Sequence, residues 1–89
     1  MAKRYNLNLR GTQDDKQVNW LELFETWKQR ARRTVIWSVQ TGSDGRYAAR
    51  VEIDGANVPN IVGYGQSPRE AKINVVTQLD KAEPAILTI

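Results

Sequence analysis

The stretch Gly63-Tyr-Gly-Gln-Ser-Pro-Arg-Glu-Ala-Lys72 joins the end of an apparent strand to the start of a helix. Ser67 is a favoured N-cap, a proline fills the first helical position, and Glu70 stands where its carboxylate can fold back on the cap. Arg69 and Lys72 add positive charge to a helix end whose free N–H groups already attract anions. This junction predicts a helix start that can hold a phosphate, although a well-capped surface helix with solvated charges would show the same residues.

Upstream of this junction the hydrophobic pattern is that of strands. Residues Thr34–Gln40 and Arg46–Asp54 alternate apolar and polar side chains, and the turn residues Gly42–Gly45 separate them. Asn60–Tyr64 reads as a short third strand, followed by the second helix over residues 67–82. We therefore expect an antiparallel hairpin and a third strand between two helices.

A first helix is predicted over roughly residues 20–32, because its apolar residues recur at three- and four-residue intervals. Asn19 and Glu22 form a possible capping pair at its start. A second stripe on the same helix points away from the apolar face and is free to meet a partner. The apolar face comprises Trp20, Leu23, Phe24, Trp27 and Ala31, and the second stripe comprises Leu21, Glu25, Lys28 and Arg32.

These elements define an α+β fold of order α-β-β-β-α. The chain has 89 residues, of which 40% are hydrophobic and 26% charged, so we expect a single small domain. We assign residues 19–83 to that domain and residues 1–18 to an N-terminal arm or extra edge strand. Residues 84–89 form an apolar C-terminal tail that is too short for a helix of its own.

Composition excludes several classes of function. The chain has no cysteine and no histidine, which removes disulfides, the usual zinc sites, thiol nucleophiles and imidazole bases. We expect no enzymatic activity, metal, cofactor or small-molecule substrate. No apolar run reaches the ~20 residues that span a bilayer, and the N-terminus lacks the apolar segment of a secretion signal, so we expect a cytoplasmic or nuclear protein.

The basic residues are concentrated near the N-terminus. The net charge is +3, and residues 1–33 carry eight Lys or Arg against four Asp or Glu, whereas residues 34–89 carry five against six. Such a balance permits a polyanionic partner without requiring one.

The pattern over residues 19–82 resembles the double-stranded-RNA-binding domain family. Leu23-Phe24-Glu25 is similar to the Leu-x-Glu of the family's first helix. Val51–Gly55 is similar to its second strand and turn, and Gly63–Lys72 to its glycine turn and lysine-rich second helix. The resemblance implies a three-stranded antiparallel sheet with both helices packed on one face, and binding of double-stranded RNA by shape, phosphate and 2′-hydroxyl contacts.

The resemblance also implies which residues touch the duplex. The exposed stripe of the first helix would enter one minor groove, the loop between the first two strands the next, and the start of the second helix would sit on phosphates between them. The residues implicated are Leu21 and Glu25 in the groove, Lys28 and Arg32 at its rim, Ser43 in the loop, and Arg69 and Lys72 on the second helix.

A protein-interaction or dimerisation module of the same fold is the alternative. The loop around Ser43 is shorter than that of the family and carries Asp44, and Pro68 replaces the first of three usual lysines. Two apolar terminal segments, or an exposed sheet edge, could then bind a protein partner or a second copy. The terminal residues concerned are Tyr5, Leu7, Leu9, Ile86, Leu87 and Ile89.

Overall fold

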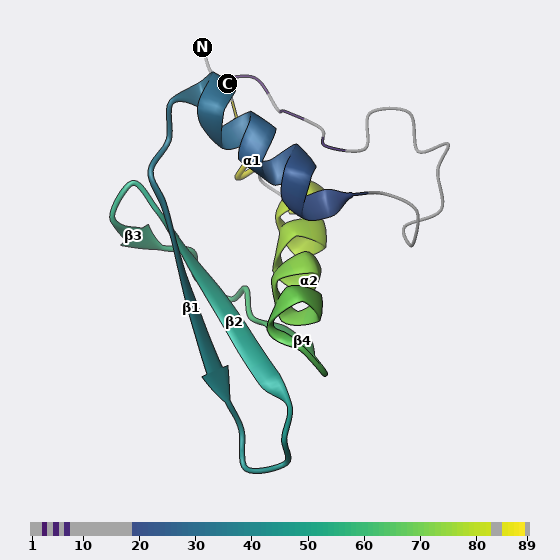
Figure 1. Cartoon of the computed structure of the whole chain (residues 1–89). Coiled ribbons are helices and arrows are strands. Elements are labelled where there is room, and N and C mark those ends of the chain that lie inside the picture. The colour runs from purple at the N-terminus through teal and green to yellow at the C-terminus, as the bar shows by residue number, and fades with distance from the viewer. Residues whose placement is uncertain (1–2, 4, 6, 8–18, 83–84, 89) are drawn as a thin grey trace.

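The computed structural model describes residues 3, 5, 7, 19–82 and 85–88 (Figure 1). Two helices and an antiparallel sheet confirm the expected α+β class and its order. Trp37 is touched from both helices, since the Phe24 ring meets its ring edge-on at 5.7 Å and the Lys72 Nζ lies 5.6 Å from its centre. Both helices therefore cover the same face of the sheet. The elements are α1 (Trp20–Ala31), β1 (Val35–Thr41), β2 (Tyr47–Ile53), β3 (Ala56–Asn57), β4 (Gly63–Gly65) and α2 (Pro68–Lys81).

β1 and β2 form the predicted hairpin, with Val35 opposite Ile53 and Thr41 opposite Tyr47. The alternation of the sequence decides which side chains face the helices, because successive side chains of a strand point to opposite faces. Ala49 and Val51 of β2 are buried against the helices, while Arg50 between them is exposed on the opposite face. The two faces of the hairpin are thus as predicted.

The third strand differs from the prediction. Instead of one strand over residues 60–64, two short strands pair with opposite ends of β2: β3 with Glu52 and Ile53, and β4 with Tyr47 to Ala49. The register changes between them because residues loop out at Pro59 and Asn60, where Asn60 adopts a left-handed φ of 65°. The loop buries Ile61 in the core, and the Gln78 side chain of α2 donates a 2.9 Å hydrogen bond to the Val62 carbonyl.

β4 lies unusually close to α2 because it contains two glycines. A Cβ on Gly63 would lie 2.7 Å from the backbone N of Val75 and would overlap the Ala71 carbonyl, and one on Gly65 would lie 2.7 Å from the Ala71 N. The Gly-x-Gly sequence therefore lets strand and helix backbones meet directly.

The two ends of the chain complete the core beside α1 and α2. Leu7 and Leu87 are buried, and the Tyr5 N–H donates to the Leu87 carbonyl at 2.9 Å. The indole N–H of Trp27 donates to the Thr88 carbonyl at 3.0 Å, which satisfies the one polar group of a buried side chain. The described parts of the arm and tail are thus components of the domain.

Asp54 joins the start of β1 to the turn after β2. Its carboxylate accepts hydrogen bonds from the Thr34 N–H at 3.0 Å and from the Arg33 guanidinium at 2.7 Å, and its own N–H donates to the Thr34 carbonyl. The backbone hydrogen bond from Thr34, and then the bond from Arg33, lower the pKa of Asp54. Asp54 and Gly55 both have positive φ, as a two-residue hairpin turn requires.

We expect Gly63→Ala to destabilise the domain by about 1–3 kcal/mol, because a Cβ at this position forces α2 away from β4. Urea unfolding followed by circular dichroism measures the change. Gly42→Ala is the matched control, since its Cβ would meet a side-chain oxygen of Asp44 at 3.0 Å and no backbone atom closer than 3.5 Å. Equal stability of the two variants would contradict the proposed close contact.

Asp54→Asn should destabilise the domain near neutral pH, since asparagine suits the turn but cannot pair with Arg33 as an anion. The folded-state pKa of Asp54 is lowered. Its contribution is therefore complete above its ordinary pKa of about 4 and is lost as pH falls through the folded-state value.

Unfolding curves of both proteins at several pH values should consequently converge in acid. Asp44→Asn, which removes an exposed loop carboxylate, controls for the general effect of charge. A stability difference that stays constant down to about pH 2 would show that ionisation of Asp54 is not its source.

Candidate nucleic-acid interface

Three of the four residues predicted for the exposed stripe lie on α1. Leu21 and Lys28 are half-buried and Glu25 is exposed, and the Lys28 Nζ lies 3.2 Å from the Glu25 Oε1. An exposed ion pair of this kind contributes little to stability and can open at small cost. The stripe therefore presents one apolar side chain and a pair of opposite charges.

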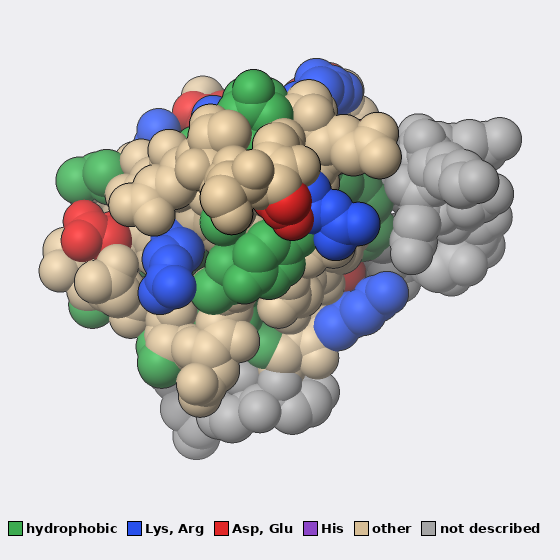
Figure 2. All heavy atoms as spheres, turned by 90° about the horizontal axis from the view of Figure 1, so that it is seen from below, with side chains coloured by type: hydrophobic (Ala, Val, Ile, Leu, Met, Phe, Trp, Pro, Cys, Tyr) green, Lys and Arg blue, Asp and Glu red, His purple; other side chains and the backbone are tan. Residues whose placement is uncertain are grey.

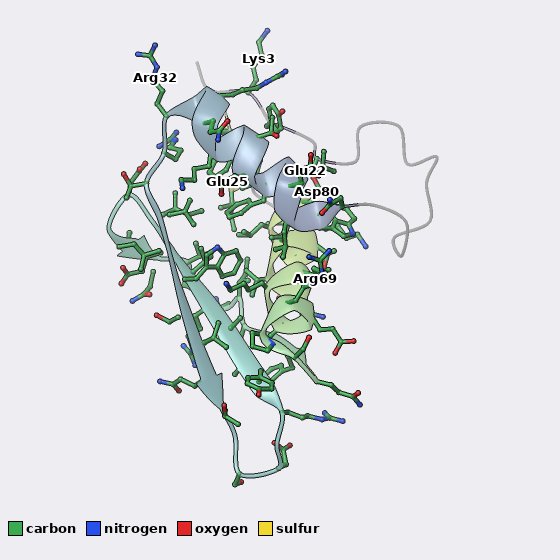
Figure 3. The ribbon with its side chains drawn as sticks, in the orientation of Figure 1. Lys3, Glu22, Glu25, Arg32, Arg69 and Asp80 are labelled. Atoms are coloured by element: carbon green, nitrogen blue, oxygen red, sulfur yellow. The ribbon has the colours of Figure 1, made fainter. Side chains whose placement is uncertain are left out.

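Arg32 is not part of that stripe, because α1 ends at Ala31. Arg32 is the C-cap in a left-handed conformation with φ 55°, and its N–H and that of Arg33 donate to the last free carbonyls of the helix. Figure 3 shows its side chain projecting from the end of α1, away from α2. The predicted capping pair at the other end also differs, since the Asn19 side chain donates to Glu22 and caps no N–H.

The Ser67 cap predicted at the start of α2 is present, but the Glu70 carboxylate folds back to the N–H of Gln66, one residue before the cap. The Ser67 Oγ accepts from the Glu70 N–H at 3.1 Å, and the Glu70 carboxylate accepts from the Gln66 N–H at 2.8 Å. Since Pro68 has no N–H, the Arg69 N–H is the first-turn donor that this arrangement leaves unused. Glu70 partly neutralises the helix end, so anion binding here depends on the basic side chains.

Those basic side chains have different surroundings. Arg69 is exposed and forms no ion pair with any described residue. Lys72 is half-buried, with its ammonium over the Trp37 ring at 5.6 Å, a distance typical of a cation–π interaction. Arg69 therefore offers a guanidinium that no described carboxylate holds, whereas Lys72 offers a charge held against β1.

The loop between β1 and β2 is a tight turn. The Gly42 N–H donates to the Arg46 carbonyl at 2.7 Å, and the Asp44 carboxylate accepts from the Arg46 N–H at 3.0 Å. Ser43 is exposed at the tip beside this carboxylate. The loop has no long basic side chain at its tip, and its nearest cation is Arg46.

Arg46 and Tyr64 were not among the predicted contact residues. Tyr64 is 60% exposed, and both side chains line a shallow hollow of about 550 Å³ that also includes Gln66 and Glu70. The hollow lies between the hairpin and the start of α2, which become neighbours because β4 pairs with the hairpin end of β2. The sequence signal for Arg46 is its position directly after the Asp44-Gly45 turn.

The three regions predicted to contact RNA follow one another along one direction of the fold. In Figure 1 the hairpin turn lies at one end, α1 lies at the other, and the start of α2 lies between them. Figure 2 views the hairpin end, where separate basic side chains surround a hydrophobic patch with an acidic side chain beside it. Figure 3 shows that Arg32 and Arg69 do not converge. The surface is therefore suited to several separated anionic groups rather than to one small anion.

The apolar terminal segments, in contrast, are occupied within the chain. Leu7 and Leu87 are 7% and 1% exposed, and Tyr5 and Ile86 are packed against the core. Leu9 and Ile89 lie outside the described residues. Leu7 and Leu87 therefore have little apolar surface left to offer a partner, whereas Tyr5 and Ile86 remain partly exposed.

No group of three or more potential metal-ligating side chains is found among the described residues. Within the same residues, no helix is both long and apolar enough to cross a membrane.

Comparisons of the chain with protein-family models, with curated proteins and with solved structures find no match.

Proposed function

We propose that this domain binds double-stranded RNA without catalysing a reaction on it, recognising the shape of the A-form duplex rather than its sequence. The observation that carries the proposal is the exposed guanidinium of Arg69, which pairs with no acidic side chain of the described residues. It stands at the start of α2, which lies between α1 and the hairpin turn (Figure 1). Phosphate groups on a duplex are spaced along its backbone, and a set of separated cations fits them.

The start of α2 would hold the phosphate backbone. Arg69 can reach one phosphate with its own N–H donors, and its backbone N–H remains available beside them. Lys72 would bind a second phosphate from its position over Trp37. Because the ring already restricts the Lys72 side chain, that side chain loses less conformational entropy on binding.

The α1 stripe would enter the minor groove. Leu21 supplies a contact with sugars, and Glu25 can accept a hydrogen bond from a ribose 2′-hydroxyl, which DNA lacks. The ion pair that now joins Glu25 to Lys28 would open, and Lys28 would turn to a phosphate at the groove edge.

The hairpin would add little to affinity. Ser43 can donate one hydrogen bond, and Arg46 is the cation available near it, but Asp44 repels phosphate. With Lys28, Arg46, Arg69 and Lys72 as phosphate ligands, the logarithm of the affinity should fall against the logarithm of salt concentration with a slope of about −3 to −4. We therefore expect modest affinity and a strong salt dependence.

Protein interaction through the two terminal segments is the less favoured function, because Leu7 and Leu87 are in the core. A protein partner that pairs with a sheet edge would not require those side chains.

The Arg69→Ala variant tests the RNA proposal. At about 0.1 M salt we expect it to weaken binding of a ~20 base-pair RNA duplex by about five- to tenfold and to reduce the salt slope by about one unit. Arg50→Ala is the matched control, since it removes the same charge from the opposite face of the sheet. Fluorescence anisotropy with the RNA duplex, the same DNA duplex and single-stranded RNA gives the affinities.

Lys72→Met should also weaken binding of the RNA duplex, because it removes the charge. The methionine side chain keeps most of the contact with Trp37. Two results would overturn the proposal: equal affinity for all three nucleic acids, or equal affinities of the Arg69→Ala and Arg50→Ala variants for the RNA duplex.

Glu70→Gln should strengthen binding of the RNA duplex by about two- to fivefold, because it removes a negative charge from the start of α2. The glutamine oxygen can still accept the hydrogen bond from the Gln66 N–H, so the cap is retained. Circular dichroism should confirm an unchanged helix content.

Glu52→Gln, which removes a negative charge from β2 away from α2, is the control for net charge. If both variants strengthen binding equally, long-range attraction rather than a phosphate at the start of α2 would explain the effect.

A further inference from the structure

The outer edge of β1 is paired with no strand in the part of the chain that the structure describes. Among the described residues, β1 has one strand neighbour, β2, so its other side presents free backbone N–H and C=O groups. Its sequence, Val-Ile-Trp-Ser-Val-Gln-Thr, contains no charged residue, proline or glycine. Proteins usually block such edges with lysine, proline or a bulge, because an open edge recruits another strand.

The opposite edge of the sheet carries the protection that β1 lacks. There the third strand is broken into β3 and β4, and Pro59 and the left-handed Asn60 stand in the break. A continuous additional strand cannot pair along that edge. One edge of this sheet is therefore closed to strand addition, and the other is open.

The hydrogen bonds within the hairpin determine which groups of β1 face outward. The Asp54 N–H donates to the Thr34 carbonyl, and the Gly42 N–H donates to the Arg46 carbonyl, so even-numbered residues of β1 bond to β2. Hydrogen-bonding direction alternates along a strand. The outward N–H and C=O groups consequently belong to Val35, Trp37, Val39 and Thr41.

We propose that two copies of the chain join through their β1 edges, antiparallel, about a two-fold axis between the two Ser38 residues. This register places Trp37 opposite Val39 of the second copy and Val35 opposite Thr41. It is the register in which all the outward groups find partners, giving about eight hydrogen bonds. The result is one continuous sheet across both copies, and it does not depend on RNA binding.

Apolar burial also favours a second copy. The helix-facing residues of β2, Ala49 and Val51, are at most 2% exposed, whereas Val35, Trp37 and Val39 of β1 are only half-buried. In the proposed register Trp37 would pack beside a β-branched side chain of the other copy, a favourable cross-strand pair. The dimer thus covers the incompletely buried row of β1.

Charge complementarity supports the same register. Antiparallel pairing about Ser38 brings Arg32, the C-cap of α1 three residues before β1, toward Asp44 in the hairpin turn of the second copy. Both side chains are exposed, and neither forms an ion pair with a described residue. By symmetry the pair occurs twice, at the two ends of the interface. Opposite charges at both ends disfavour slipped registers.

Ser38→Cys tests the register directly, since the chain has no other cysteine. Directly opposite residues of an antiparallel pair have Cα atoms about 4.5–5.5 Å apart, within reach of a disulfide. We expect mild oxidation of Ser38→Cys to give a covalent dimer that is visible on non-reducing gels.

Ile36→Cys is the matched control. Two copies of Ile36 would lie about 13 Å apart along the strands, too far for a disulfide, so cross-linking should be at least about tenfold slower. A mixture of Ile36→Cys and Gln40→Cys should cross-link efficiently, because these positions are opposite each other in the proposed register.

Light scattering over a concentration series tests the dimer without modification. The mass should rise from that of the 10.1 kDa chain to twice that value and no further, since the other sheet edge is blocked. Ser38→Lys places two like charges at the two-fold axis, so the change from one chain to two should require at least about tenfold higher protein concentration. Asn57→Lys, on the β3 edge, should leave the concentration at which the dimer forms unchanged. Mixing Ser38→Lys with Ser38→Glu should restore the dimer.

The proposal is overturned if the mass stays that of one chain up to millimolar concentration, or if it continues to rise beyond two copies. It is also overturned if Ser38→Cys and Ile36→Cys cross-link at equal rates. An RNA duplex too short to reach both copies should bind Ser38→Lys and the unchanged chain with equal affinity, so failure of the dimer and failure of the nucleic-acid function can be told apart.

Discussion

The direct backbone contact between β4 and α2 is the constraint on which the candidate interface depends. Gly63 and Gly65 leave no side chain between the two backbones, so the helix begins immediately beside the strand that precedes it. Because β4 pairs with the hairpin end of β2, the first turn of α2 must lie close to the β1–β2 turn. The position of Arg69 relative to the hairpin therefore follows from strand register and glycine placement, and not from any contact made by Arg69 itself.

The parts of the fold that local chemistry determines could be predicted from the sequence. The two faces of β1 and β2 follow from alternation, and the Ser67–Glu70 cap follows from residue types at fixed spacing. The third strand could not be predicted in the same way. Its break depends on burying Ile61 and on a hydrogen bond from Gln78, which is distant in sequence, so the local pattern between Asn60 and Tyr64 did not contain the register change.

The candidate site shows the same division. Periodicity placed Leu21, Glu25 and Lys28 on one face of α1, but it could not reveal that the helix would end before Arg32. A left-handed C-cap usually contains glycine, and an arginine there gives no sequence signal. Likewise, the contact of Lys72 with Trp37 and the pairing of Tyr5 with Leu87 join segments whose proximity only the tertiary structure establishes. These contacts remove apolar surface that the isolated sequence segments would have offered to a partner.

The two proposed surfaces are geometrically compatible. A two-fold axis through antiparallel neighbouring strands runs perpendicular to their common sheet, so the helix layers of both copies would lie on the same side of it. Each copy would then direct its Arg69 toward that side, and a duplex long enough to reach both would bind the second copy intramolecularly. Weak contacts between separated cations and phosphates, as proposed for this domain, would gain most from such an arrangement. A second binding site held nearby at high effective concentration raises the overall affinity without any new contact in the first site. Dimerisation through β1 would thus compensate for a short hairpin turn that we expect to add little to phosphate binding.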